Sequence, residues 1–230
     1  MNKHFISFAD SKFYNALNKL KNEAENSEFF NHVKMYNEFD LSDDILKYCN
    51  NNQKGYGFWI WKPIIVKKHF DSLNENDLLV YADAGCSIYQ TGKEIFESYI
   101  NHLNTNDAIF FQMEHKEKTW TKMDTIIELG GEDLLDTGQL TACCFLLKKN
   151  DKTKKIINDW FEASVNKRNL IDDTISISKN DETFMEHRYD QSILSIIVKK
   201  NKIELFDDHT WKFYSHGSKD YPINCTRRRY

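Results

Sequence analysis

Proline and glycine are scarce in this sequence, with two prolines and eight glycines among 230 residues. This scarcity excludes collagen-like repeats and the Pro- or Gly-rich composition of flexible linkers. Hydrophobic residues make up 40% of the chain and charged residues 29%, a balance that argues against disorder. The chain is long for one small domain and short for two, so we expect a single domain over residues 1–230.

Cysteine is also infrequent, and its spacing indicates no framework. The five cysteines are an odd number and include no C-x-x-C pair: Cys49, Cys86, Cys143, Cys144 and Cys225. This pattern predicts neither a structural zinc site nor a set of disulfides. Cys143 and Cys144 lie in an apolar run, and we expect them to be inert core residues. Reduced thiols of this kind suit the cytoplasm.

Long apolar runs and an excess of basic charge are absent as well. No run approaches the 18 residues of a membrane span, and residues 5–9 are too few for a signal peptide. The formal net charge of −4 gives no reason to expect nucleic acid as a partner. We therefore expect a soluble cytoplasmic protein, in which local basic groups hold any anionic substrate.

Short apolar runs alternate with helical periodicity along the chain. Strands are predicted at residues 5–9, 78–82, 108–112, 140–147 and 203–206. Helices are predicted after Asp10, around Ile45, from Pro63, and at 93–103, 121–129, 151–165 and 189–198. This alternation predicts an α/β domain with a mixed, mostly parallel sheet flanked by helices. Ligands of such sheets bind beyond the carboxyl ends of the strands, which singles out Asp10, Asp83 and the segment after Gln112.

Asp83 follows the most apolar of these strands and is the first candidate for chemistry. A carboxylate at a strand end faces the ligand crevice, where it can bind a ribose hydroxyl or a metal that bridges a diphosphate. The alternative is that Asp83 only caps a turn with Gly85.

Residues 54–63 hold two glycines and four aromatic residues. Glycine permits close backbone approach, an aromatic ring such as that of Trp61 stacks on a base or sugar, and Lys54 and Lys62 can meet phosphate. The alternative is an aromatic core wedge with solvated lysines, which suits Phe58 and Trp59 better than a binding role.

Residues 186–192 place several reactive side chains at the start of a helix. Asp190, Gln191 and His187 offer a carboxylate, an amide and an imidazole that can contact a sugar ring or take part in acid–base catalysis. The alternative is a helix N-terminus at which the macrodipole favours acidic residues.

The aperiodic segment after residue 207 contains a last set of candidates. His216, or His209 upstream, can ligate a metal, and Lys219 can neutralise a diphosphate. Arg227, Arg228 and Arg229 are a further candidate for an anion site. The alternative is a surface histidine for the first set and a frayed, charged terminus for the arginines.

Taken together, these segments resemble a glycosyltransferase family of the GT-A fold, found in capsule and surface-glycan gene sets and in some large viruses. The matching strings are residues 54–63, 81–86, 118–122, 136–142 and 186–192, and the similarity spans roughly residues 5–229. The resemblance implies a GT-A-like, Rossmann-like domain that transfers a sugar from a nucleotide-diphosphate donor to a glycan or lipid-linked acceptor. It further implies a role in surface polysaccharide biosynthesis, with membrane contact that is at most peripheral.

Glycosyl transfer needs cations at the departing diphosphate and carboxylates near the sugar. On the resemblance, the expected catalytic residues are Asp190, Gln191, Asp136 and His187. The expected donor-binding residues are Asp10, Lys54, Trp61, Lys62, Asp83, Gly85, Lys219 and Arg228. We expect residues 207–230 to close over the donor.

A more distant similarity is to glycogenin-like retaining transferases, in which an Asp-x-Asp motif binds metal and a late His-x-Gly-x-x-Lys motif meets the diphosphate. Here the second acid is absent after Asp83, and the spacing from His216 to Lys219 is one residue shorter. Two alternatives follow. Either Mn²⁺ or Mg²⁺ is held by Asp83 with His216 or His209, or lysines and arginines replace the metal.

Two rival functions fit the sequence less well. A sugar-phosphate nucleotidyltransferase usually has a Gly-rich basic loop after its first strand, and residues 8–11 lack that loop. A non-catalytic carbohydrate-binding module is usually all-β, whereas helices and strands alternate here.

Overall fold

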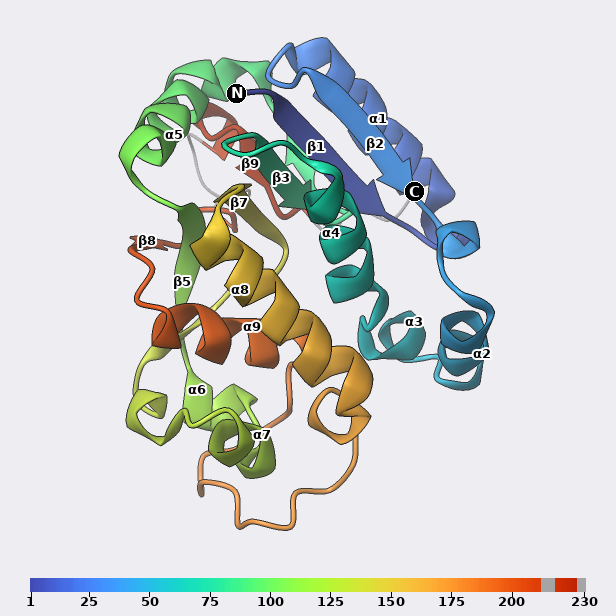
Figure 1. Ribbon diagram of the computed structural model, residues 1–230, viewed down its shortest axis with the longest axis vertical. Coiled ribbons are helices and arrows are strands. Elements are labelled where there is room, and N and C mark those ends of the chain that lie inside the picture. Colours follow the sequence, from blue (N-terminus) through green and yellow to red (C-terminus); the bar gives the residue numbers. More distant parts are fainter. Residues whose placement is uncertain (212–217, 227–230) are drawn as a thin grey trace.

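A mixed sheet of seven strands forms the centre of the computed structural model, which describes residues 1–211 and 218–226 (Figure 1). The strands are β1 (Lys3–Phe8), β2 (His32–Tyr36), β3 (Leu78–Ala82), β5 (Ala108–Lys116), β6 (Gly138–Leu140), β7 (Cys144–Lys148) and β8 (Leu205–Asp207). Their order is β2-β1-β3-β7-β5-β6, and β8 pairs with β5. β1 runs parallel to β2 and β3, and β8 runs parallel to β5. β7 is antiparallel to β3 and β5, and β6 is antiparallel to β5. Only β6 and β7 therefore reverse direction, which confirms the predicted mixed, mostly parallel sheet.

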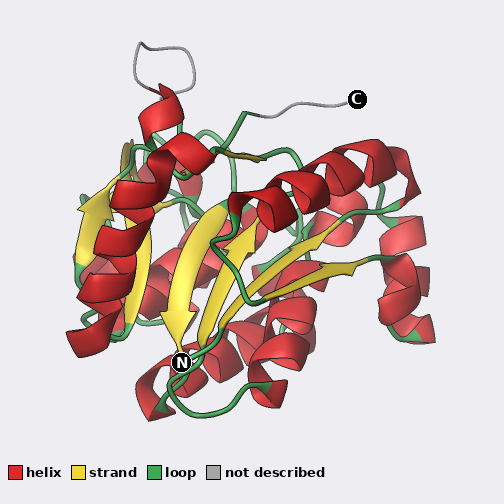
Figure 2. Cartoon of the chain, turned by 90° about the horizontal axis from the view of Figure 1, so that it is seen from above, coloured by secondary structure: helices red, strands yellow, loops and turns green. Residues whose placement is uncertain are grey.

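Helices cover both faces of this sheet (Figure 2). They are α1 (Tyr14–Ser27), α2 (Asp43–Asn51), α3 (Gly55–Phe58), α4 (Trp61–Ser72), α5 (Lys93–Thr105), α6 (Glu117–Trp120), α7 (Met123–Glu128), α8 (Asp151–Phe161) and α9 (Tyr189–Lys200). A small second sheet joins β4 (Ser87–Ile88) to β9 (Ile223–Asn224) in antiparallel fashion. None of the helices in the described part of the chain is long and apolar enough to cross a lipid bilayer.

Alternating side chains of the strands build one apolar core on each face. In β3, Leu79 and Tyr81 pack with α4, α8 and α9, while Leu78 and Val80 pack with α1 and α5. Every residue of β3 is buried because helices cover both sides of this central strand. That burial explains why β3 is the most continuous apolar run in the sequence.

The structure changes several predicted boundaries. The run at residues 140–147 forms two strands, because residues 141–143 turn the chain between β6 and β7. The helix predicted at 121–129 begins at Met123. It ends before Gly130, whose φ of +63° suits a glycine after a helix. β2 is not predicted by the sequence pattern, because it is an edge strand whose His32 and Lys34 are exposed.

Candidate functional site

A cavity of about 670 Å³ opens where β1 and β3 end and β7 begins. This is the edge of an α/β sheet at which ligands bind, and the volume is that of a small-molecule site. The segments that line the cavity follow β1 and β3, precede β7 and begin α4 and α9, and Trp211 and Cys225 complete it. The cavity thus lies at the strand ends that the sequence singles out.

The ammonium group of Lys62 lies between two carboxylates that line this cavity. Its Nζ is 3.1 Å from Asp83 Oδ1 and 3.2 Å from Asp190 Oδ2. It also donates a hydrogen bond of 3.2 Å to the carbonyl oxygen of Ala142. The side chains of Lys62 and Asp190 are only 3% and 5% exposed, whereas that of Asp83 is 34% exposed. Asp83 is therefore the carboxylate that a ligand reaches first.

Burial and charge together set the ionisation of these groups. Burial raises the pKa of Asp190 to about 6, although the neighbouring Lys62 acts in the opposite direction. Burial also acts to lower the pKa of Lys62, but Asp190 and Asp83 outweigh it and raise that pKa above its ordinary value. Lys62 is therefore a cation at neutral pH. The hydroxyl of Tyr81 donates a 2.5 Å hydrogen bond to Asp83 Oδ1 and fixes that carboxylate.

Lys62 also joins four strings that lie far apart in the sequence. It belongs to residues 54–63, and its partners belong to residues 81–86, 136–142 and 186–192. Gln191 strengthens the same junction, since its Oε1 accepts from the backbone N–H of Ala142 at 3.2 Å. Four of the five strings that carry the resemblance thus meet at one point.

The segment before α4 has an unusual backbone. All of residues 55–59 have positive φ angles: 55°, 50°, 82°, 55° and 59° along the chain. Tyr56, Phe58 and Trp59 carry side chains, and each such residue costs about 1–2 kcal/mol in this left-handed region. Backbone strain of this kind is typical of functional sites.

The two glycines of this segment permit the left-handed turn. A Cβ on Gly57 would lie 2.7 Å from Cys49 Sγ, and a Cβ on Gly55 would lie 2.2 Å from the ring of Trp59. The sequence predicts that these glycines allow close approach to the backbone. The groups that approach them are Cys49 of α2 and Trp59 of the same turn. The turn delivers Trp61 and Lys62 to the start of α4, with Pro63 in the first helical turn as predicted.

Aromatic rings form one wall of the cavity. Phe8 and Trp61 stack at 4.2 Å with an interplanar angle of 17°, and Tyr56 stacks on Phe8 at 6.5 Å. Phe58 and Trp59 instead stack on Tyr189 at 5.5 and 5.3 Å. Phe58 belongs to the buried core, as its alternative reading predicted, whereas Trp59 packs against that core and also lines the cavity.

The first turn of α9 is anchored to the segment around Lys54. Lys54 Nζ lies 2.9 Å from Glu186 Oε1 and 4.8 Å from the ring centre of Tyr189. Tyr189 has a φ of +52° and precedes Asp190 directly. Lys54 therefore lines the cavity and also contacts Tyr189, the residue directly before Asp190.

Asp10 and Gly85 are the remaining predicted donor-binding residues that line the cavity. Asp10 follows β1, and its Oδ1 accepts a hydrogen bond of 3.2 Å from the backbone N–H of Lys12. Burial raises the pKa of Asp10. The carbonyl oxygen of Gly85 accepts a hydrogen bond from the hydroxyl of Thr226.

Four other predicted residues do not enter the cavity as the structure describes it. His187 is buried, and backbone groups of Lys122 and Leu170 engage both of its ring nitrogens. Asp136 is exposed and pairs with Lys118 at 2.7 Å. Lys219 is exposed, and its carbonyl oxygen accepts from Thr91. His209 is buried against Tyr99 and Tyr221.

His216 and Arg228 lie outside the described residues. The segment predicted to close over the donor contributes Trp211 and Cys225 to the cavity.

Sequence reasoning missed several lining residues, among them Phe8, Lys12, Tyr56 and Trp211. Phe8 is the last residue of β1 and lies inside the strand predicted at residues 5–9, so the strand-end rule that selected Asp10 points to its neighbourhood. Trp211 lies in a segment without periodicity, where no local signal distinguishes it.

The described residues of this cavity do not fit a bound Mn²⁺ or Mg²⁺ ion. The Lys62 ammonium fills the place of a cation between Asp83 and Asp190. Within residues 1–211 and 218–226, three potential metal-ligand atoms come close together only as thiols, those of Cys86, Cys143 and Cys225. Mn²⁺ and Mg²⁺ prefer oxygen ligands, which this cluster does not supply.

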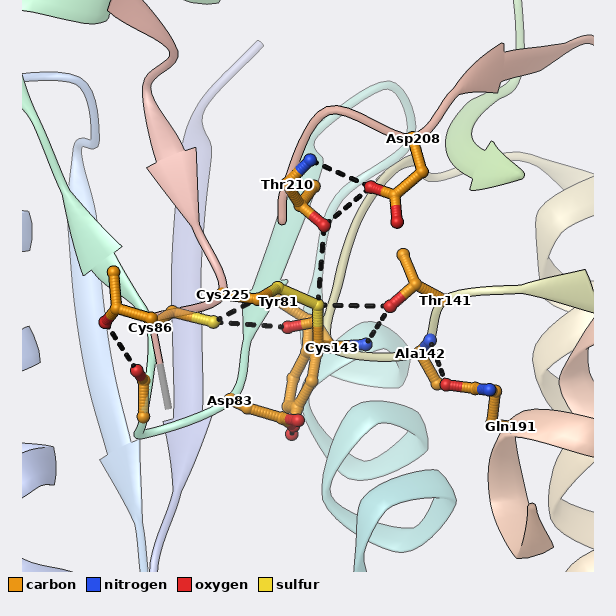
Figure 3. Close-up of a disulfide and its surroundings, with 12 residues drawn as sticks. Tyr81, Asp83, Cys86, Thr141, Ala142, Cys143, Gln191, Asp208, Thr210 and Cys225 are labelled. Carbon is orange, nitrogen blue, oxygen red and sulfur yellow. Dashed lines mark hydrogen bonds between the residues drawn. A yellow bond between two sulfur atoms is a disulfide. The ribbon is translucent and has the colours of Figure 1, made fainter. Parts of the chain in front are cut away.

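The prediction that every cysteine is reduced is wrong. Cys143 and Cys225 form a disulfide at the cavity wall (Figure 3). The two residues are 82 positions apart, so only the tertiary fold reveals the pairing. Cys49, Cys86 and Cys144 are free and buried, and Cys144 is the core residue expected of it.

No protein-family model matches this sequence, and neither does any curated protein. Among solved structures, a glycosyltransferase involved in the glycosylation of the major capsid of PBCV-1 matches at a TM-score of 0.50 and 12% identity, over 97% of this chain and 93% of that one. Mouse xyloside xylosyltransferase 1 matches at 0.46 and 12%, over 97% of each chain. The glycosyltransferase GlyE of Streptococcus pneumoniae matches at 0.46 and 12%, over 98% of this chain and 54% of its own. The first match shows that the chain has the fold of a glycosyltransferase, as the sequence resemblance implies.

Proposed function

We propose that this protein is a glycosyltransferase that takes its sugar from a nucleotide-diphosphate donor. The observation that carries the proposal is the buried Lys62 ammonium between Asp83 and Asp190, in a cavity at the ligand-binding edge of a glycosyltransferase fold. The acceptor is a hydroxyl group of a glycan or a lipid-linked saccharide. The sequence strings described above support a role in surface polysaccharide biosynthesis.

The donor is oriented by the two ends of the cavity. The stacked rings of Phe8 and Trp61 offer an apolar face to the base, and Asp10 beside them can accept hydrogen bonds from the ribose. The helices α4 and α9 both begin at the cavity, and their N-termini favour an anion. The diphosphate therefore lies over Lys62, which is the residue that joins the two helix starts.

Charge develops in opposite senses as the glycosidic bond to the diphosphate breaks. The anomeric carbon becomes positive and the departing diphosphate becomes more negative. Asp190 is ionised at neutral pH, since its pKa is about 6, and we assign it to the sugar side. Lys62 stabilises the leaving group and holds Asp190 in place. Gln191 is fixed by Ala142 and by Gln139, and it positions the sugar without ionising.

The proposed reaction uses protein cations at the diphosphate. Lys62, Lys12, Lys54 and Arg188 all line the cavity. Lys62 is buried between two carboxylates that offset its charge, so the other three cations supply the further positive charge that a diphosphate needs. We therefore expect little or no requirement for Mn²⁺ or Mg²⁺.

A thermal-shift screen of nucleoside diphosphates and sugar nucleotides, with and without Mn²⁺, tests the donor class. A ligand at about 100 times its Kd stabilises the protein by roughly 2.7 kcal/mol. For a chain of this length that corresponds to roughly 5–10 °C in Tm. Stabilisation by nucleoside triphosphates but not by sugar nucleotides would instead indicate a nucleotidyltransferase.

A further inference from the structure

Three buried sulfur atoms lie together at the wall of the cavity (Figure 3). Cys143 and Cys225 form the disulfide, and the Sγ of Cys86 lies 3.8 Å from that of Cys225. All three sulfurs lie within 4.8 Å of one another. Cys86 and Cys225 flank the paired residues Ser87 and Asn224 of β4 and β9, so the Cys86 thiol can form a disulfide with Cys225 after a change of side-chain torsions.

Each sulfur belongs to a segment that shapes the cavity. Cys143 follows Ala142, whose backbone contacts both Lys62 and Gln191. Cys86 lies in the turn after β3, and its backbone N–H donates to the carbonyl oxygen of Asp83. The cluster therefore links the C-terminal segment to the two turns that hold the ion pairs.

The C-terminal segment around Cys225 is also held without the disulfide. β9 pairs with β4, next to Cys86, and the backbone N–H of Cys225 donates to the carbonyl oxygen of Thr210 at 2.6 Å. The hydroxyl of Thr226 donates to the carbonyl oxygen of Gly85 at 2.9 Å. These contacts keep Cys225 near Cys86 when its bond to Cys143 is broken.

We propose that these three cysteines are a redox modification site, in which Cys225 bonds to either Cys143 or Cys86 and a dithiol reductant releases it from both. In the exchange, the thiolate of Cys86 attacks Cys225 Sγ, the Cys143–Cys225 bond breaks, and the proton lost by Cys86 ends on Cys143 Sγ. No oxidant or reductant is consumed in that step. In the reduction, a dithiol supplies two electrons and two protons and becomes a disulfide itself.

The surroundings of Cys86 set the speed of this exchange. Burial raises the pKa of the Cys86 thiol, and the nearby Asp83 adds to the effect. The thiolate is the attacking species, so the exchange is slow at neutral pH and accelerates as the pH rises. After release, hydrogen bonds alone hold the segment around Cys225, so we expect its backbone to open more often. This inference does not depend on which reaction the cavity supports.

Disulfide mapping by mass spectrometry after acid quenching and alkylation tests the exchange. Cys143→Ser, kept in oxidised glutathione, is expected to show a Cys86–Cys225 bond, whereas Cys86→Ser keeps only the Cys143–Cys225 bond. Cys144→Ser is the matched control, because Cys144 is buried beside Cys143 but lies outside the cluster, and its pattern is expected to equal the wild type. Free Cys86 and Cys225 thiols in folded Cys143→Ser, or a metal ion held by all three thiolates in the purified wild type, would overturn the proposal.

A second measurement uses the wild type, so that it does not depend on the folding of a variant. Incubation at pH 9 is expected to yield a fraction with the Cys86–Cys225 bond. Treatment with dithiothreitol is expected to speed hydrogen exchange in residues 221–226 by about tenfold or more, and to leave α9 unchanged. Absence of the second bond at pH 9, or unchanged exchange in residues 221–226 after the disulfide is shown to be reduced, contradicts the proposal.

Discussion

Substitution of Lys62 by methionine tests the energetics of the cavity most severely. The change removes the ammonium group but keeps a long unbranched side chain, so Asp190 and Asp83 are left close together without their shared cation. Removal of one partner from a buried pair costs about 3–5 kcal/mol. Asp83 is 34% exposed and remains partly solvated, so we expect the lower end of that range. A loss of about 3 kcal/mol lowers Tm by roughly 6–12 °C in a chain of this length.

The pH dependence of this loss distinguishes charge from packing. Lys62 lowers the pKa of Asp190, so that pKa rises further in Lys62→Met. Asp190 is then protonated more readily as the pH falls, and the unpaired charge disappears. The difference in Tm between wild type and variant is therefore expected to be large at pH 7–8 and to shrink toward pH 5.

Thermal unfolding followed by circular dichroism is the assay, with Lys67→Met as the matched control. Lys67 lies on the same helix and pairs with Asp71 at the surface, where an ion pair contributes about 0–1 kcal/mol. The double variant Lys62→Met/Asp190→Asn is expected to regain part of the lost stability. If Lys62→Met melts like Lys67→Met, or if its deficit is the same at pH 5 and pH 8, the electrostatic account of the cavity is wrong.

Four further predictions concern the same site. Asp190→Asn is expected to fold and to bind the donor but to lose about 100-fold or more in kcat. In the wild type, kcat is expected to fall as the pH drops through about 6, the pKa of Asp190. A flat profile of kcat between pH 5 and pH 8 contradicts the assignment. Asp83→Asn is expected to abolish transfer without unfolding, and near-normal turnover would remove Asp83 from the mechanism. Gly57→Ala is expected to lower the free energy of unfolding in urea by roughly 1–3 kcal/mol, because its φ is +82° and the added Cβ meets Cys49; an unchanged midpoint refutes this. Transfer is expected to survive EDTA, and loss of activity that Mn²⁺ alone restores would show that Lys62 is not the principal cation.

The strands that could be predicted are those whose burial leaves a continuous apolar run. Leu78–Ala82 is buried on both faces and reads clearly in the sequence, whereas β2 exposes polar side chains at a sheet edge and gives no such signal. The end of β5 was not predicted, because Met113 is only partly buried and the polar residues 114–116 are exposed. Edge pairing depends on neighbours in space, which the local pattern does not contain.

Single site residues could be predicted, but their partners could not. Asp83 follows a strand, and Lys62 and Asp190 lie at helix starts, so local rules select each of them. Their ion pairs join residues from distant parts of the chain and depend on tertiary approach. Asp136 shows the same limit. The sequence groups it with the site, but ion pairs with Lys116 and Lys118 hold it at the surface.

Turnover of a sugar nucleotide is the most direct test of the proposed activity. Purified protein is incubated with single sugar nucleotides and a saccharide acceptor, and mass spectrometry follows the nucleoside diphosphate and the glycosylated product. We expect one donor class to yield both products in equal amounts with the wild type and neither with Asp190→Asn. Equal turnover by the two proteins would remove Asp190 from catalysis. The proposed activity would be contradicted if the wild-type protein neither binds nor consumes any sugar nucleotide but forms one from a nucleoside triphosphate and a sugar 1-phosphate.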